Sequence, residues 1–214
     1  MFVVIRSVFR PEVVATLALL TSDPNVKRVH VYGDCVAHRL PRGKITCCAV
    51  PSNPMQQVID SDEEFLPYPL TKKGYKMSEY IDDQTRIRWR AQIAMDMFAC
   101  LGHVLEMIHG DERFVWLEND VWLQSQELIN AMKIQRGTFA CWKPEWQRSK
   151  MYLGYGTQCF VIDARSIRAI RQHLLSYSLV QPADWIISDA FPTMQAVSVS
   201  VHKSKRSTRL MWTV

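Results

Sequence analysis

Short apolar runs alternate with a helical pattern in the first part of the chain. Residues 2–8 are nearly all β-branched or apolar, which is typical of a strand covered on both faces. Pro11 then opens a segment whose apolar residues recur at helical spacing. Two further apolar runs, 28–32 and 45–50, end at Gly33-Asp34 and at Pro51. This order predicts strand, helix, strand and strand, as in a parallel sheet.

Residues 51–80 form a long segment without either periodicity. It contains four prolines and an acidic patch at Asp60, Asp62, Glu63 and Glu64. Such a segment is either a binding loop or a solvated insertion, and its composition fits both. An apolar stripe then predicts a helix that begins at Asp82 or Asp83, which are good N-cap residues, and ends at Gly110.

The second half continues the alternation. It predicts strands at 113–121, 138–142, 158–162 and 196–201, with helices at 125–134 and after Asp163. The expected fold class is therefore α/β, with a central mixed, mostly parallel sheet and helices on both faces. A length of 214 residues fits a single domain that spans 1–214.

Composition is that of an ordinary globular protein, with 48% apolar and 22% charged residues. No apolar run approaches the roughly 20 residues of a membrane helix, and the first residues lack the order of a signal peptide. The six cysteines lie in apolar stretches without a CxxC pair, so we expect buried free thiols and a cytoplasmic protein.

The acidic end of one apolar strand is the most informative motif. In residues 114–121 the apolar run leads into Glu118-Asn119-Asp120. Side chains two apart on a strand point the same way, so both carboxylates can converge at the carboxyl end of the strand, where ligands bind in open α/β sheets. Two such carboxylates repel each other unless a cation lies between them, and oxygen ligands suit Mn²⁺ or Mg²⁺. The alternative is a polar strand end that faces solvent.

This segment resembles the Asp-x-Asp signature of the GT-A glycosyltransferases, with Glu118 in place of the first Asp. The resemblance extends to the order of elements, to the turn Gly154-Tyr155-Gly156 before residues 159–163, and to residues 182–185. It implies a GT-A-like fold and a metal-dependent glycosyltransferase, for hexosyl or deoxyhexosyl transfer, with a UDP-sugar donor. It also implies a glycan or glycoprotein acceptor, such as a viral capsid glycoprotein in the host-cell cytoplasm, and a chain that is the N-terminal part of a longer protein.

The resemblance also assigns roles around the metal. Asp120 and Glu118 become ligands of the cation, and His202, after the last predicted strand, becomes a third ligand. Lys203 and Lys205 neutralise the leaving diphosphate, and the first strands contribute donor-binding groups at Arg6, Ser7 and Asp34. Arg86 and Arg90, four apart on one helix face, are further candidates for the donor phosphates. For the arginine and lysine side chains among these residues, surface salt bridges explain the sequence equally well.

The acceptor side is less determined. An inverting reaction needs a carboxylate base, for which Asp184 and Asp189 are the candidates, although either residue also suits a helix cap. A retaining reaction needs no such base. Trp142, Tyr155 and Trp185 are candidates for an aromatic platform under the acceptor sugar, with core packing as the alternative.

Two other functions fit part of the pattern. A metal-dependent nucleotidyltransferase or phosphohydrolase also places paired carboxylates at a strand end, but usually needs further acids, and Asp82 and Asp83 suit helix caps better. A nucleic-acid-binding module would use the net charge of +5 and the basic C-terminal segment, which contains Lys203, Lys205, Arg206 and Arg209. Because the aromatic residues are not interleaved with that segment, we do not expect nucleic acid as a partner.

Overall fold

The computed structural model describes eleven stretches of the chain. They are residues 2–7, 11–33, 43–65, 83–109, 112–118, 121–122, 140–143, 159–183, 186–187, 195–198 and 202–203. For some of these residues, among them Glu118 and His202, the description covers the backbone and not the side chain.

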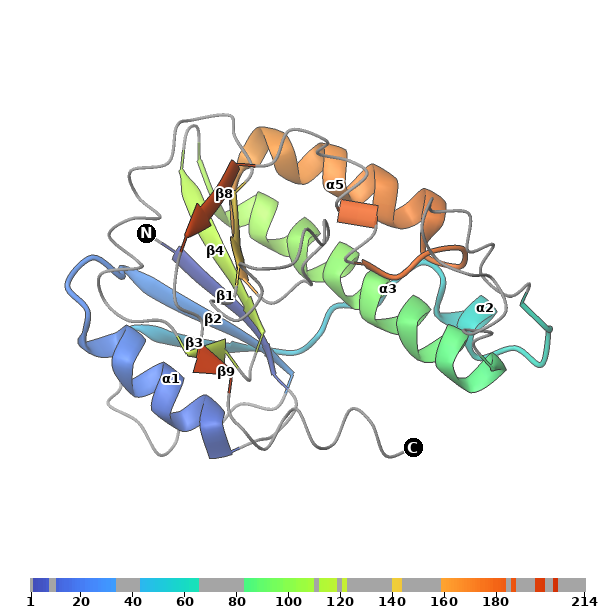
Figure 1. Ribbon diagram of the computed structural model, residues 1–214, viewed down its shortest axis with the longest axis horizontal. Helices are drawn as coiled ribbons and strands as arrows, with labels where there is room; N and C mark the ends of the chain where they lie inside the picture. Colours follow the sequence, from blue (N-terminus) through green and yellow to red (C-terminus); the bar gives the residue numbers. More distant parts are fainter. Residues whose placement is uncertain are drawn as a thin grey trace.

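A seven-stranded sheet forms the centre of the described structure (Figure 1), with the strand order β3-β2-β1-β4-β7-β6-β8. The strands are β1 (Phe2–Ser7), β2 (Arg28–Gly33), β3 (Ile45–Cys48), β4 (Arg113–Glu118), β6 (Ala140–Lys143), β7 (Cys159–Asp163) and β8 (Gln195–Ser198). Strands β3, β2, β1 and β4 run parallel to one another. Strand β7 is antiparallel to both β4 and β6, and β6 is parallel to β8. The prediction of a mixed, mostly parallel sheet is confirmed.

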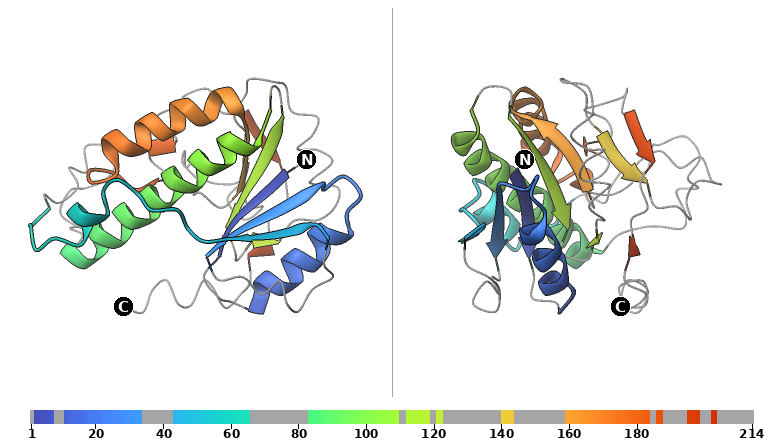
Figure 2. Two further views of the ribbon diagram at one scale, coloured as in Figure 1. Left: turned by 180° about the vertical axis from the view of Figure 1, so that it is seen from behind. Right: turned by 90° about the vertical axis from the view of Figure 1, so that its left-hand side faces the viewer.

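Helices cover both faces of this sheet, as predicted (Figures 1 and 2). Helix α1 (Pro11–Ser22) joins β1 to β2 on one face, while α3 (Gln84–Met107) and α5 (Ala164–Tyr177) lie side by side on the other. A single turn, α2 (Gln56–Ile59), lies beside the amino-terminal part of α3. No described helix is both long and apolar enough to span a bilayer.

A large core cluster lies between the sheet and the α3–α5 layer. Val4, Tyr32, Phe114 and Trp116 of three neighbouring strands are buried there, against apolar residues of both helices. Because strand residues alternate between the two faces, Val3, Ile5 and Val29 belong to the opposite face, which α1 covers, and all three are fully buried. Strand β1 is therefore covered on both faces, as predicted for residues 2–8.

Helix α3 begins and ends close to the predicted limits. Asp83 is its N-cap, and its carboxylate accepts a hydrogen bond of 2.7 Å from the backbone N–H of Arg86. Farther along, the Arg171 side chain of α5 donates to the Phe98 carbonyl at 3.1 Å, with its guanidinium carbon 4.2 Å from the centre of the Phe98 ring. A Cβ at Gly102 would lie 2.9 Å from a nitrogen of Arg171, so a small residue at that position lets the two helices approach.

Two details differ from the predictions. The acidic strand stops at Glu118, and a separate short strand, β5 (Val121–Trp122), follows it. The cysteines are not uniformly buried free thiols: Cys48 is half-buried and free, Cys100 is buried and free, and exposed Cys47 is disulfide-bonded. The cysteines therefore do not support the prediction of a reducing compartment.

His30 in β2 introduces a pH dependence that can be measured. Its side chain is buried, with 3% exposed, and burial, Arg28 and His103 hold its pKa below the ordinary value of 6.5. The unfolded chain then binds the proton more readily than the folded chain. The stability that His30 contributes is complete above about pH 6.5 and is lost as the pH falls through its lower folded pKa.

We therefore expect the free energy of unfolding to fall more steeply below about pH 6.5 in the wild type than in His30→Gln, which cannot titrate. Urea unfolding between about pH 7.5 and about pH 5 measures both slopes. Equal slopes in the two proteins would show that His30 is not the responsible group.

Candidate functional site

The carboxyl ends of β1 and β4 lie next to each other at one edge of the sheet. The parallel register pairs Arg6 with Glu118, and on the other side of β1 it pairs Ser7 with Gly33. In open α/β sheets this edge is where ligands bind. The structure therefore brings three of the predicted site positions, 6, 7 and 118, to the end of two adjacent strands.

A second pairing brings the end of the chain to the same place. Strand β5, which begins three residues after Glu118, pairs antiparallel with β9 (His202–Lys203). Trp122 is opposite His202, and Val121 is opposite Lys203. These backbone pairs join two segments about 80 positions apart and put positions 202 and 203 within a few residues of the acidic triplet.

The described part of the chain contains no group of three or more His, Cys, Asp or Glu side chains placed to hold a metal ion. That statement does not cover the side chains of the three predicted metal ligands. Asp120 lies outside the described residues, and Glu118 and His202 are described by their backbone. Their role stays a prediction.

Arg6 makes a buried ion pair on the α3 side of the sheet. Its Nε donates to Oδ2 of Asp96 at 2.9 Å, and its Nη2 makes a still shorter contact with the same oxygen. The Asp96 side chain is 8% exposed and that of Arg6 is 25% exposed. Asp96 lies near the middle of α3 between buried Met95 and Met97, so the carboxylate faces the interior and the arginine reaches it from the end of β1.

A chain of amide groups continues from this ion pair. Gln92, one helical turn before Asp96, donates to its Oδ1 at 2.6 Å. The Gln92 side chain also exchanges hydrogen bonds of 3.0 Å with Gln56 of α2, which in turn donates to Asp60 at 3.0 Å. Both oxygens of the buried carboxylate are therefore satisfied, and α2 is connected to the centre of α3.

A polar contact inside the core lies on the same face of the sheet. The Tyr32 hydroxyl and Nδ1 of His103 are 2.9 Å apart, and the two rings meet edge to face at 5.7 Å. Burial raises the pKa of the Tyr32 hydroxyl well above its ordinary value of 10.0. Tyr32 is neutral at physiological pH, and its contact with His103 connects β2 with α3.

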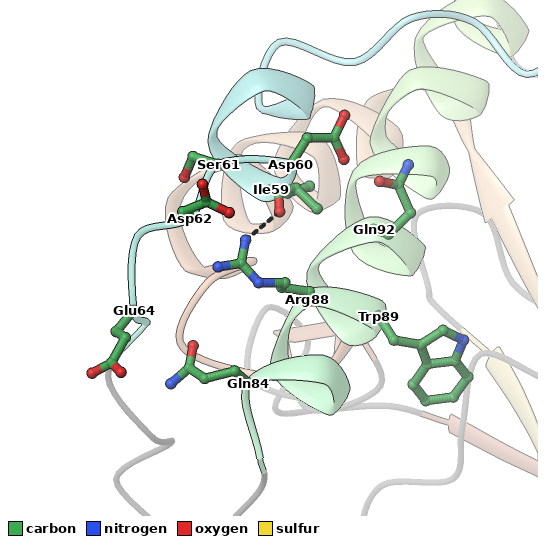
Figure 3. A pocket seen from close by; sticks show the side chains of 9 residues that line it. All are labelled: Ile59, Asp60, Ser61, Asp62, Glu64, Gln84, Arg88, Trp89 and Gln92. Atoms are coloured by element: carbon green, nitrogen blue, oxygen red, sulfur yellow. Dashed lines mark hydrogen bonds between the residues drawn. The ribbon is translucent and has the colours of Figure 1, made fainter.

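A hollow of about 660 Å³ lies between the end of α2 and the first turns of α3 (Figure 3). Acidic side chains line one wall and Trp89, which is 54% exposed, stands at the opposite side. Arg88 crosses the hollow to donate to the carbonyl oxygens of Ile59 and Glu63. Part of the predicted irregular segment is thus held against α3 by an arginine that sequence analysis did not single out.

The remaining predicted residues are placed less completely. Arg86 is exposed and Arg90 half-buried, in the part of α3 that runs beyond the carboxyl edge of the sheet (Figure 1). From Asp96 they lie about 15 Å and about 9 Å along the helix axis, at about 1.5 Å per residue. Trp142 lies in β6, paired with Val197 of β8. The others lie outside the described residues: Asp34, Asp120, Tyr155, Asp184, Trp185, Asp189 and Lys205.

Asp96 is a site residue that sequence analysis missed. A signal for it exists, because the acid interrupts an otherwise apolar run in which residues 94 to 97 are all buried. A charge at such a position is rare unless it is paired. Its partner is 90 residues away in the sequence, which no local pattern identifies.

Comparison with known proteins finds similar structures but no match in sequence. No protein-family model matches the chain. No curated protein matches it in sequence. Many solved structures are similar in fold, and three of them are described next.

A 4-diphosphocytidyl-2C-methyl-D-erythritol synthase from Anaerococcus prevotii superposes with a TM-score of 0.55 at 8% identity, over 98% of this chain and 92% of that one. A 2-C-methyl-D-erythritol 4-phosphate cytidylyltransferase from Francisella tularensis gives 0.55 at 9%, over 99% and 96%. The glycosyltransferase GlyE from Streptococcus pneumoniae gives 0.54 at 10%, over 92% and 44%. At these identities the likeness concerns the fold alone, and it confirms the predicted GT-A-like α/β class.

Proposed function

We propose that this chain is a divalent-cation-dependent glycosyltransferase that moves a hexosyl or deoxyhexosyl group from a UDP-sugar to a glycan acceptor. The observation that carries the proposal is the junction at the end of β4. Strand β4 ends at Glu118 there, and residues 121–122 pair with the strand that holds His202 and Lys203. The backbone at positions 118, 202 and 203 is thus brought to one stretch of the carboxyl edge, where ligands of α/β sheets bind.

The residues at this junction fit a cation. In the proposal Glu118 and Asp120 supply carboxylate oxygens and His202 an imidazole nitrogen, a donor set suited to Mn²⁺ or Mg²⁺. The charge balance supports the same conclusion. Arg6 is already paired with the Asp96 carboxylate. Two further carboxylates would therefore leave the edge negative and repel a diphosphate, unless a cation neutralises them.

The mechanism follows from these positions. When bound, the cation neutralises the diphosphate and stabilises the negative charge that develops on the leaving group. Lys203 and Lys205 add positive charge beside the departing phosphates, and Arg6, Ser7 and Asp34 hold the nucleotide at the ends of the first strands. Arg86 and Arg90 extend over the edge from α3. A carboxylate base, Asp184 or Asp189, would accept the proton of the acceptor hydroxyl in an inverting reaction.

The acceptor is the least constrained partner in this proposal. Trp142, Tyr155 and Trp185 would provide aromatic faces for a sugar ring, since aromatic side chains combine apolar area with a polar edge. A viral capsid glycoprotein is the acceptor that the sequence resemblance suggests.

A nucleotidyltransferase is the second candidate, and the breadth of the structural match favours it. The two cytidylyl-type enzymes match 98% and 99% of this chain and 92% and 96% of their own length, whereas GlyE is matched over 44% of its length. Such an enzyme would use the same edge and the same cation, but the bond that breaks would lie between the α- and β-phosphates of a nucleoside triphosphate.

The reaction products separate the two candidates. We expect the protein with Mn²⁺ and a UDP-sugar, without acceptor, to release UDP and free sugar slowly, because water can replace the acceptor. With a nucleoside triphosphate and a sugar phosphate we expect no pyrophosphate. Chromatography of the nucleotides and a pyrophosphate assay measure both. Pyrophosphate release that depends on the sugar phosphate, with no UDP formed, would favour the nucleotidyltransferase.

A further inference from the structure

The Arg6–Asp96 pair is more elaborate than packing requires. Asp96 occupies a buried position of α3, and a buried carboxylate costs several kcal/mol unless it is paired and hydrogen-bonded. Arg6 and Gln92 satisfy both of its oxygens. An apolar residue would fill the same position without these partners, so packing alone does not account for the pair.

The geometry leaves part of the guanidinium available. An arginine has five N–H donors, and among the described residues the bonds to Oδ2 of Asp96 occupy two of them. A quarter of the Arg6 side chain is exposed, 25%, while Asp96 is almost covered at 8%. The carboxylate therefore holds one side of the fork, and the exposed part of the arginine side chain lies at the end of β1.

The register fixes which part of a ligand that fork would meet. Residue 6 pairs with position 118, the first acid of the triplet. In β4, Phe114 and Trp116 are buried in the α3 layer, where Asp96 also lies, and by the alternation of strand residues position 118 belongs to the same face. Arg6 thus lies beside position 118 in the register, and in the proposal its outer N–H groups meet the diphosphate that the triplet binds.

We propose that Asp96 is a positioning residue that holds Arg6 in the orientation in which its outer N–H groups bind a phosphate oxygen of the donor diphosphate. This inference rests on the proposed function. It assigns Arg6 to the diphosphate and not to the nucleoside. A planar fork of N–H donors matches phosphate oxygens, and a fork fixed before binding loses less entropy than a free side chain.

The test compares binding of UDP and of uridine, both in Mn²⁺, by calorimetry or ligand-observed NMR. The variants are Arg6→Gln, Arg6→Lys and Asp96→Asn. Lys27→Gln, which removes an exposed charge before β2, is the matched control. We expect Arg6→Gln to weaken the binding of UDP about tenfold or more, and Asp96→Asn and Arg6→Lys to weaken it by a smaller factor. All three variants should bind uridine with the affinity of the wild type.

The ratio of the two dissociation constants distinguishes positioning from a merely structural role. A general loss of structure lowers the binding of both ligands. Substitution of an arginine that contacts the nucleoside would do the same. Equal losses for UDP and uridine, or UDP binding by a folded Asp96→Asn that equals that of the wild type, would therefore overturn the inference. If Asp96→Asn does not fold, as thermal unfolding would reveal, Arg6→Lys decides, because it keeps a cation beside Asp96 but lacks the fork.

The proposed function can fail separately. If the wild type binds no UDP in the presence of Mn²⁺, the transferase proposal itself is wrong and the positioning role falls with it. If the wild type binds UDP and loses it on removal of the cation, while the Arg6 and Asp96 variants behave as the wild type, only the present inference is wrong.

Discussion

Asp120→Asn is expected to abolish Mn²⁺-dependent binding of UDP, with an affinity loss of at least about 100-fold. Even residues that only support metal ligands cost about 10- to 100-fold in metal affinity when they are changed, so a lost ligand should cost more. Asparagine keeps the size of the side chain but removes the charge. Turnover of a UDP-sugar should disappear together with binding, because both depend on the neutralised diphosphate.

Calorimetry with UDP in the presence of Mn²⁺ and of a chelator measures this effect. Asp62→Asn is a suitable control, because Asp62 is an exposed carboxylate that lines the hollow beside α2. It should bind UDP as the wild type does. An Asp120→Asn protein that is folded and still binds UDP in a Mn²⁺-dependent manner would contradict the assignment of this residue.

Trp116→Ala is expected to produce the largest loss of stability, about 3–5 kcal/mol. Trp116 is the central residue of β4, between Val4 of β1 and Phe160 of β7, and its side chain is 2% exposed. Its removal would leave a cavity under α3 and α5 in a core that packs at nearly crystalline density. A loss of that size is a large fraction of the stability of an ordinary domain.

Trp89 provides the matched control for this experiment. The same deletion there, Trp89→Ala, removes a side chain that is 54% exposed, so we expect a change within about 0.5 kcal/mol. Urea unfolding of the two variants and the wild type gives both values. Similar losses for the two tryptophans would mean that β4 is not at the centre of the core.

Much of the fold was accessible from local patterns. The strands β1, β2 and β4 consist of apolar and β-branched residues bounded by turn residues, and their predicted limits differ from the observed ones by few residues. Helix α3 was recognised because its apolar stripe is long and because Asp83 is a good N-cap, whose bond to the Arg86 N–H the structure contains. These signals are short-range, so a single sequence carries them.

Other features depend on contacts between distant parts of the chain. The insertion of β7, antiparallel, between β4 and β6 follows from pairing that no local pattern reports. The turn α2 has four residues, too few for a helical period, and hydrogen bonds from Asn53 and Gln92 to the Gln56 side chain connect it with its surroundings. The disulfide at Cys47 likewise requires knowledge of which thiols approach each other.

The candidate site likewise has features that local sequence patterns reveal and features that only the strand register reveals. The carboxyl end of β4 and its acidic triplet could be located from the sequence, because an apolar strand that ends in acids marks a sheet edge. The neighbour of position 118 is Arg6, and the neighbour of position 122 is His202, and both facts come from strand register. Asp96 could not be assigned a role, because its meaning depends on an arginine at the far end of the sequence.

The central claim is that acids at the end of β4 bind the cation that holds the donor diphosphate. It is tested most directly by crystals grown with UDP and Mn²⁺, from which anomalous scattering locates the manganese. The account predicts one manganese between the Glu118 and Asp120 carboxylates and the diphosphate, with the His202 imidazole among its ligands. A manganese bound elsewhere, or a diphosphate that leaves the 118–120 carboxylates untouched, would contradict it.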